Sequence, residues 1–253
     1  MLNDWLPLMF LILTLPPLYL MQRWINRHLQ GLGLLFTGDS DSAVVLYFLV
    51  LLPGVALHEL SHWLAAIFLR VRVGKLSLWP KKKRGGQVRL GSVSVGASDP
   101  LRASLIGVAP LVVGSLVILA VGQLVLGIGD LGRLLLYGTW TDLWGQLVAY
   151  WRVPDFFLWL YLIFAIANAM LPSESDRAAW PMMGLFLAGV AGVFLLVGGL
   201  SLVAARVKAT FLAAAGYLAY ALGLAAVVDL LFAGVIVVVE QVAGRALGRR
   251  VEY

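Results

Sequence analysis

The sequence predicts an all-α polytopic membrane protein, with about six transmembrane helices and a short re-entrant or interfacial β-hairpin after the second helix. Of its 253 residues, 61% are hydrophobic and only 13% are charged, and the mean hydropathy is +0.93. Apolar runs of about 20 residues recur, which is the length a helix needs to cross a hydrocarbon core of about 30 Å. The sequence has no cysteine, which excludes disulfides, thiolate metal ligands and a cysteine nucleophile.

Six apolar segments account for the predicted transmembrane helices. A polar link around His28 follows the first, and we interpret His28 as an interfacial side chain rather than a ligand. Asp41 or Ser42 is expected to cap the second helix. We expect Pro53-Gly54 to bend or loosen the second helix about one turn before His58. The six spans are expected at residues 5–20, 43–69, 103–126, 156–171, 182–204 and 211–238.

The helical pattern is interrupted between residues 70 and 96. Two stretches in which apolar and polar residues alternate loosely lie on either side of a basic turn at residues 80–86, which predicts short strands. An extended hairpin offers an edge on which an unwound substrate can bind as an added strand. Residues 127–153, where Trp140, Trp144 and Trp151 alternate with polar residues, are expected to form an interfacial helix.

The basic residues indicate topology. Nineteen lysines and arginines against thirteen acidic residues give a net charge of +6. They cluster between spans, so we expect contacts with the anionic lipid bilayer and none with nucleic acid. The distribution favours a multi-pass protein of a prokaryotic cell membrane with both termini in the cytosol. We divide the chain into an N-terminal helix and link (1–42), a catalytic membrane core (43–180) and two C-terminal helices with a short basic tail (181–253).

A His-Glu-x-x-His motif lies within the second apolar segment. If this segment is helical, His58 and His62 are one turn apart on the same face, so that both imidazoles can bind one zinc ion. Glu59 is then placed as the general base. Two imidazoles and a carboxylate in an apolar span are costly unless a partner compensates them, and a bound dication does so. The motif therefore predicts a metal-dependent hydrolase.

A third protein ligand is expected after the fourth span. That span is shorter than a full membrane crossing, so the acidic residues that follow it can lie close to the motif helix. Carboxylates are accepted zinc ligands, and either Asp176 or Glu174 fits, with Asp176 favoured. Asp229, in the sixth span, is interpreted as a hydrogen-bonded structural residue in preference to a gate for substrate.

Taken together, these motifs resemble the site-2 protease family of intramembrane zinc metalloproteases. The family pattern is a His-Glu-x-x-His helix, a β-rich segment, a helix with a small residue before proline, and a later asparagine and proline that lead to a ligand aspartate. The resemblance covers residues 43–180, and the matching features are residues 58–62, residues 71–95, Ala109-Pro110, Asn168 and Asp176. Pro172 comes one residue later than in the pattern, and Arg177 stands where the family commonly has glycine.

The resemblance implies that His58, His62 and Asp176 bind Zn²⁺, that Glu59 is the catalytic base, and that Asn168 helps to hold substrate or the oxyanion. The expected function is that of an intramembrane zinc endopeptidase, which hydrolyses a peptide bond in or near the transmembrane segment of a membrane-anchored protein. Two alternatives remain. One is a different membrane zinc protease, such as a prenyl-protein protease with a glutamate as third ligand. The other is a membrane scaffold or transporter without catalysis.

Overall fold

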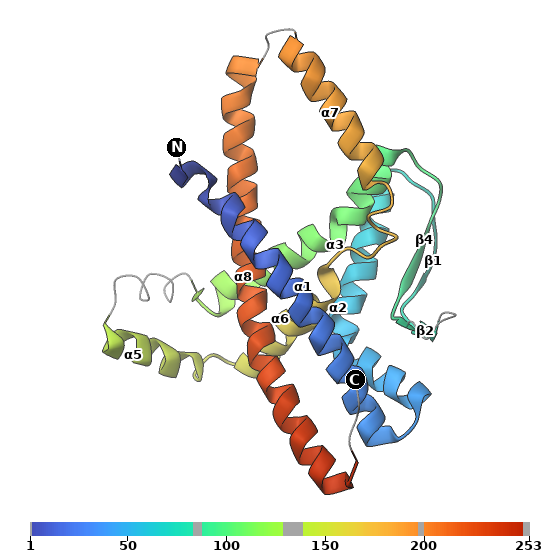
Figure 1. The fold of residues 1–253 in the computed structure, drawn as a ribbon, viewed down its shortest axis with the longest axis vertical. Coiled ribbons are helices and arrows are strands. Elements are labelled where there is room, and N and C mark those ends of the chain that lie inside the picture. Colours follow the sequence, from blue (N-terminus) through green and yellow to red (C-terminus); the bar gives the residue numbers. More distant parts are fainter. Residues whose placement is uncertain (1, 83–87, 129–138, 197–199, 250–253) are drawn as a thin grey trace.

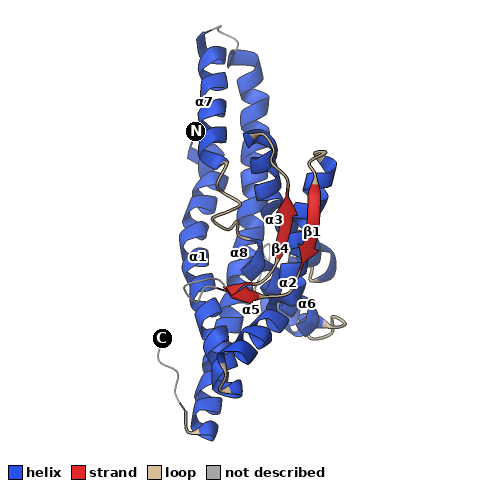
Figure 2. Cartoon of the chain, turned by 90° about the vertical axis from the view of Figure 1, so that its right-hand side faces the viewer, coloured by secondary structure: helices blue, strands red, loops and turns tan. Residues whose placement is uncertain are grey.

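The computed structural model describes residues 2–82, 88–128, 139–196 and 200–249 (Figures 1 and 2). Within these residues the chain is helical except for one small antiparallel hairpin, as the sequence predicts. The elements are α1 (Leu2–Thr37), α2 (Ser40–Phe68), β1 (Val73–Ser77), β2 (Lys81–Lys82), β3 (Val88–Arg89), β4 (Ser92–Val95), α3 (Pro100–Ala120), the π-helical turn η1 (Val121–Val125), α5 (Trp140–Tyr150), α6 (Phe156–Met170), α7 (Trp180–Leu196) and α8 (Leu200–Leu247).

Four helices of the described chain are long and apolar enough to cross a membrane. They are α1 from Trp5, α2, α3 together with η1, and α8 from Val207. The apolar helix α6 is shorter, with 15 residues. These helices indicate a membrane-embedded protein, while the number of six spans stays a prediction.

Helix α2 packs against α1, α3 and α6. Helix α1 packs along α8, and the two cross in Figure 1. The β1–β4 hairpin lies on the other side of α2, away from α1 and α8 (Figure 1). Fully buried apolar side chains from α1, α2, α3, α6 and α8 form one continuous core, which includes Leu18, Leu51, Ile118, Phe164 and Leu222. The motif helix thus contacts helices on one side and the hairpin on another.

Local sequence explains both ends of α2. Asp39 has an extended backbone, and its carboxylate accepts a 2.8 Å hydrogen bond from the Ser42 N–H, so Asp39 caps the helix and the prediction of Asp41 or Ser42 is wrong. At the other end, the N–H groups of Arg70 and Val71 donate to carbonyls of the last turn, and Arg70 has φ of +56°. This is the usual helix-ending arrangement with an arginine in the left-handed position, and it turns the chain into β1.

The predicted hairpin is present. Strands β1 and β4 are antiparallel, with Val73 opposite Val95 and Ser77 opposite Ser92, and a register shift lies between Val73 and Leu76. Strands β2 and β3 extend it at the basic end, where Lys81 is opposite Arg89. The remainder of the predicted basic turn, residues 83–87, lies outside the described residues.

The first span was predicted too short, because α1 continues through Pro16-Pro17 and through the expected link as far as Thr37. The polar residues of that link are satisfied by neighbouring helices. Asn26 accepts a 3.0 Å hydrogen bond from the Tyr47 hydroxyl on α2, and His28 contacts Glu240 of α8 at 2.8 Å. His28 is therefore a partly buried packing residue. Polar side chains that find partners between helices do not require the helix to end.

The predicted bounds near the C-terminus are also wrong. Residues 205–210, expected as a loop, lie inside α8, which begins at Leu200. The stretch around Arg206 and Lys208 has no glycine or proline to end a helix, and Lys208 lies 5.1 Å from the Trp5 ring of α1.

Helix α2 continues through Pro53, and at Gly54 a side chain would overlap the Ala165 carbonyl oxygen of α6, so this glycine permits close helix packing.

The predicted interfacial helix is represented by α5, since residues 129–138 lie outside the described part. Thr139 and Asp142 form a capping box at its start. Trp140, Trp144 and Trp151 are 87%, 69% and 70% exposed. Contact of these rings with the membrane surface stays a prediction.

Candidate metal centre

The two histidines of the motif converge as the helical spacing predicts. His58 and His62 are one turn apart on α2, and their Nε2 atoms are 3.1 Å from each other. Both side chains are largely buried, with 13% and 9% exposed. Two imidazole nitrogens at this distance repel each other when both are unprotonated acceptors, so the pair requires a proton or a cation between them.

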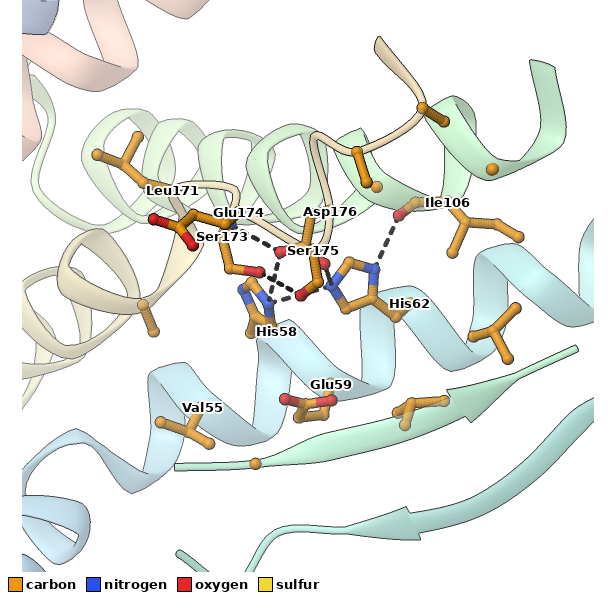
Figure 3. Close-up of a pocket in the computed structure, with 18 of the residues that line it drawn as sticks. Val55, His58, Glu59, His62, Ile106, Leu171, Ser173, Glu174, Ser175 and Asp176 are labelled. Atoms are coloured by element: carbon orange, nitrogen blue, oxygen red, sulfur yellow. Dashed lines mark hydrogen bonds and ion pairs between the residues drawn. The ribbon is translucent and has the colours of Figure 1, made fainter. Parts of the chain in front are cut away.

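The loop between α6 and α7 brings Asp176 to the histidines. Its Oδ1 atom lies 3.3 Å from His62 Nε2, and its Oδ2 atom lies 3.8 Å from His58 Nε2. One ligand atom from each of the three residues lies within 4.8 Å of the others, which makes this a group that could hold a metal ion. Figure 3 shows the two imidazoles directed from α2 toward this loop.

A backbone carbonyl on α3 orients the second histidine. His62 Nδ1 lies 2.8 Å from the Ile106 carbonyl oxygen (Figure 3). Because a carbonyl oxygen only accepts, Nδ1 carries the proton in this contact, and the lone pair of the neutral ring is on Nε2. Metal-ligating histidines in proteins are typically held by such a hydrogen bond, which fixes both the tautomer and the ring orientation.

The Asp176 loop is held by its own hydrogen bonds. The Ser173 N–H donates to Asp176 Oδ2 at 2.7 Å, and the hydroxyls of Ser173 and Ser175 are 2.8 Å apart. Arg177 Nε donates to the Ser173 carbonyl at 3.4 Å. These contacts fix the carboxylate locally, but they do not place the loop against α2.

Gly107 places the loop, because it lets the backbone of Asp176 approach α3. A Cβ atom at Gly107 would overlap the Asp176 carbonyl oxygen. Gly107 is buried, and it follows Ile106, whose carbonyl orients His62. Two consecutive residues of α3 therefore serve two different ligands of the group.

Glu59 lies on a neighbouring side of α2, facing β4 (Figure 3). It is 7% exposed. A Cβ atom at Gly91, just before β4, would lie 2.7 Å from Glu59 Cγ, so the hairpin backbone packs directly against this side chain. Glu59 is thus held between the hairpin and the histidine pair.

These residues line one cavity of about 920 Å³. Its walls come from α2, the hairpin, α3, the end of α6 and the loop that follows. Glu174 also lines the cavity, but it is exposed and, unlike Asp176, does not belong to the group of possible metal ligands. In Figure 3 its carboxylate points away from the histidines. The geometry therefore favours Asp176 over Glu174.

Asn168 lines the cavity, and its amide is engaged. Its Nδ2 donates to the Phe164 carbonyl at 3.0 Å and to Asp229 Oδ1 at 2.7 Å. Asp229 is therefore hydrogen bonded, as predicted. With both N–H bonds used, Asn168 does not donate to an oxyanion in this conformation, and substrate contact stays a prediction.

Sequence reasoning did not single out Gln22 of α1, whose side chain donates to the Ala167 carbonyl at 2.7 Å. A polar residue within an apolar helix was the signal that could have identified it.

Searches against models of protein families, curated proteins and solved structures find no match to this chain.

We expect purified protein to contain about one metal ion per chain, lost in His58→Ala and in Asp176→Ala, because each variant leaves only two protein ligands. Elemental analysis of detergent-purified protein measures this. Glu174→Ala is the matched control, since it removes a neighbouring exposed carboxylate and should retain the metal. Metal loss in Glu174→Ala with retention in Asp176→Ala would reverse the assignment.

Gly107→Ala should weaken metal affinity by about 10- to 100-fold, the range found when supporting contacts of a metal site are removed. The added methyl group displaces the Asp176 backbone while all three ligands remain. Competition with a chelator measures the affinity. In the control Gly234→Ala, on α8, the new Cβ meets no atom within 4 Å, and affinity should not change. Equal affinity in both variants would show that Gly107 does not place the loop.

Proposed function

We propose that this chain is an intramembrane zinc endopeptidase of the site-2 protease type, a multi-pass membrane protein with both termini in the cytosol. Its substrate is a membrane-anchored protein, cleaved in or near its transmembrane segment. The observation that carries the proposal is the group of His58, His62 and Asp176, which opens on the same cavity as the buried carboxylate of Glu59.

The distances in the group suit zinc. Ligand atoms about 2.0–2.1 Å from a tetrahedral zinc ion lie about 3.3 Å from one another. The three separations here are 3.1, 3.3 and 3.8 Å. Two imidazoles and one carboxylate are also a common donor set of catalytic zinc sites, which keep a fourth position for water or substrate. His58, His62 and Asp176 would therefore hold the ion.

The chain's own residues supply proton transfer and orientation. Bound zinc would contribute Lewis-acid activation of water and of the scissile carbonyl. Glu59 accepts a proton from the attacking water and gives it to the leaving amine nitrogen, the usual role of a carboxylate base in hydrolysis. Ile106 keeps the proton of His62 on Nδ1. The hairpin backbone at Gly91 restricts Glu59 to the cavity side of β4.

Strand β4 is suited to hold an unwound substrate. It pairs with β1 along one edge, and Val93 and Val95 line the cavity. A substrate helix must unwind before cleavage, because a helical backbone already uses its carbonyls in hydrogen bonds. An extended segment can recover those hydrogen bonds by pairing with a strand edge. A peptide bond of a segment paired with β4 would then lie next to the metal ligands, which line the same cavity.

The two alternatives receive less support. A zinc protease with glutamate as third ligand would require Glu174 in the group, and its place is taken by Asp176. A scaffold with a structural metal has no use for a base. Glu59 instead lines the same cavity as the metal ligands, which suits a base that acts on water bound there.

Glu59→Gln should lower the cleavage rate by about 10²- to 10⁴-fold, the usual contribution of a general base, while zinc content stays near that of the wild type. The assay uses liposomes with a model single-span protein whose helix carries a glycine-proline pair, and mass spectrometry locates the cut. Glu174→Gln, the same chemical change at an exposed cavity residue, is the control. Zinc-loaded protein that cleaves equally well with Glu59→Gln would exclude this mechanism.

A further inference from the structure

A fully buried carboxylate lies within the long apolar helix α8. Asp229 is 0% exposed, and its Oδ1 accepts the 2.7 Å hydrogen bond from Asn168. An ionisable residue in an apolar span is costly, and such residues persist where they are paired or serve a function. Asp229 does not line the cavity among the described residues, whereas Asn168 does. The hydrogen bond to Asn168 therefore connects Asp229 directly to a residue of the cavity wall.

The hydrogen bond to Asp229 fixes which way the Asn168 amide faces. The same Nδ2 also donates to the Phe164 carbonyl one turn earlier, so both N–H bonds are used. Rotation of the amide by 180° would place its oxygen against the carboxylate oxygen and the carbonyl oxygen, where nothing can donate. Asp229 and Phe164 thus select one of the two amide orientations.

The last turn of α6 is held from a second side as well. The last four carbonyls of a helix have no partner within the helix, and in α6 these include Ala167. The buried Gln22 side chain of α1 donates to the Ala167 carbonyl at 2.7 Å. Polar side chains from α1 and α8 therefore hold consecutive residues of α6, just before the loop that carries Asp176.

We propose that Asp229 is a positioning residue for substrate: its carboxylate fixes the Asn168 side chain, and with it the cavity wall at the end of α6, against which the substrate would lie. This role rests on the proposed protease function. Asp229 does not touch the metal ligands, so its removal changes how substrate is bound and leaves the metal in place.

The test compares zinc-loaded wild type with Asp229→Leu and Asp229→Asn on the model single-span substrate. Asp229→Leu should lower kcat/KM by about 10- to 100-fold, the range expected when a supporting contact is lost and a reacting group is misplaced, with zinc content unchanged. Leucine leaves one buried Asn168 N–H without its acceptor, so the melting temperature should fall modestly, and cleavage is measured well below it. Asp229→Asn keeps an acceptor oxygen for Asn168 and should stay within about threefold of wild type.

Val228→Ala is the matched control, because Val228 precedes Asp229 and is 2% exposed. It removes packing from the same helix and should lower the melting temperature while kcat/KM stays within about twofold, since the residue makes no hydrogen bond through its side chain. A fall in kcat/KM as large as that of Asp229→Leu would show that any defect in α8 impairs cleavage, and would overturn the proposal.

A double-mutant cycle with Asn168→Ala tests whether Asp229 acts through Asn168. The double variant should be no less active than Asn168→Ala alone, because the residue that Asp229 positions is already gone. The same variants in the Glu59→Gln background give the dissociation constant of a fluorescent substrate without catalysis. Additive losses, or zinc loss in Asp229→Leu, would overturn the positioning role alone. Zinc-loaded wild type without any cleavage would overturn the protease function itself.

Discussion

The site depends on the approach of the Asp176 loop to α3, because this contact completes the ligand group. His58 and His62 meet through the geometry of a single helical turn, but Asp176 comes from a loop far along the sequence. Helix α3 joins the two parts. The Ile106 carbonyl orients His62, and the missing side chain of Gly107 admits the backbone of Asp176. A change in the position of α3 would therefore disturb two ligands at once.

Several polar groups inside this apolar assembly form pairs that link helices to one another. His28 of α1 contacts Glu240 of α8, and Gln22 of α1 reaches the backbone of α6. Each pair offsets the cost of removing polar groups from water, which for an unpaired group is several kcal/mol. The pairs also favour these helices as neighbours, since each pair forms only when its two helices lie together. The Gln22 hydrogen bond, which helps to stabilise the helix assembly, therefore also holds the end of α6, and this end forms part of the cavity wall.

Local patterns in the sequence predicted the parts of the structure that depend on local geometry. The i, i+4 spacing of His58 and His62 gave the ligand pair, and the alternation around Val73 and Val95 gave the hairpin. Features that depend on neighbouring elements were missed. Polar residues of α1 were interpreted as a link, because their partners on other helices are not visible in one segment. Sequence reasoning assigned Gly107 no role in the site, because the loop it admits lies far away in the sequence.

The two departures from the site-2 protease pattern have a physical explanation in the geometry near Asp176. A residue before proline avoids the helical conformation, and Leu171, before Pro172, has φ of −67° and ψ of 134°, so α6 ends at Met170. The later proline thus shifts the position at which α6 ends, but it still ends the helix. Glycine after the aspartate would suit a positive φ, and Arg177 does not have one. Its side chain instead donates to Ser173, so the position that differs from the pattern supports the loop that presents the carboxylate.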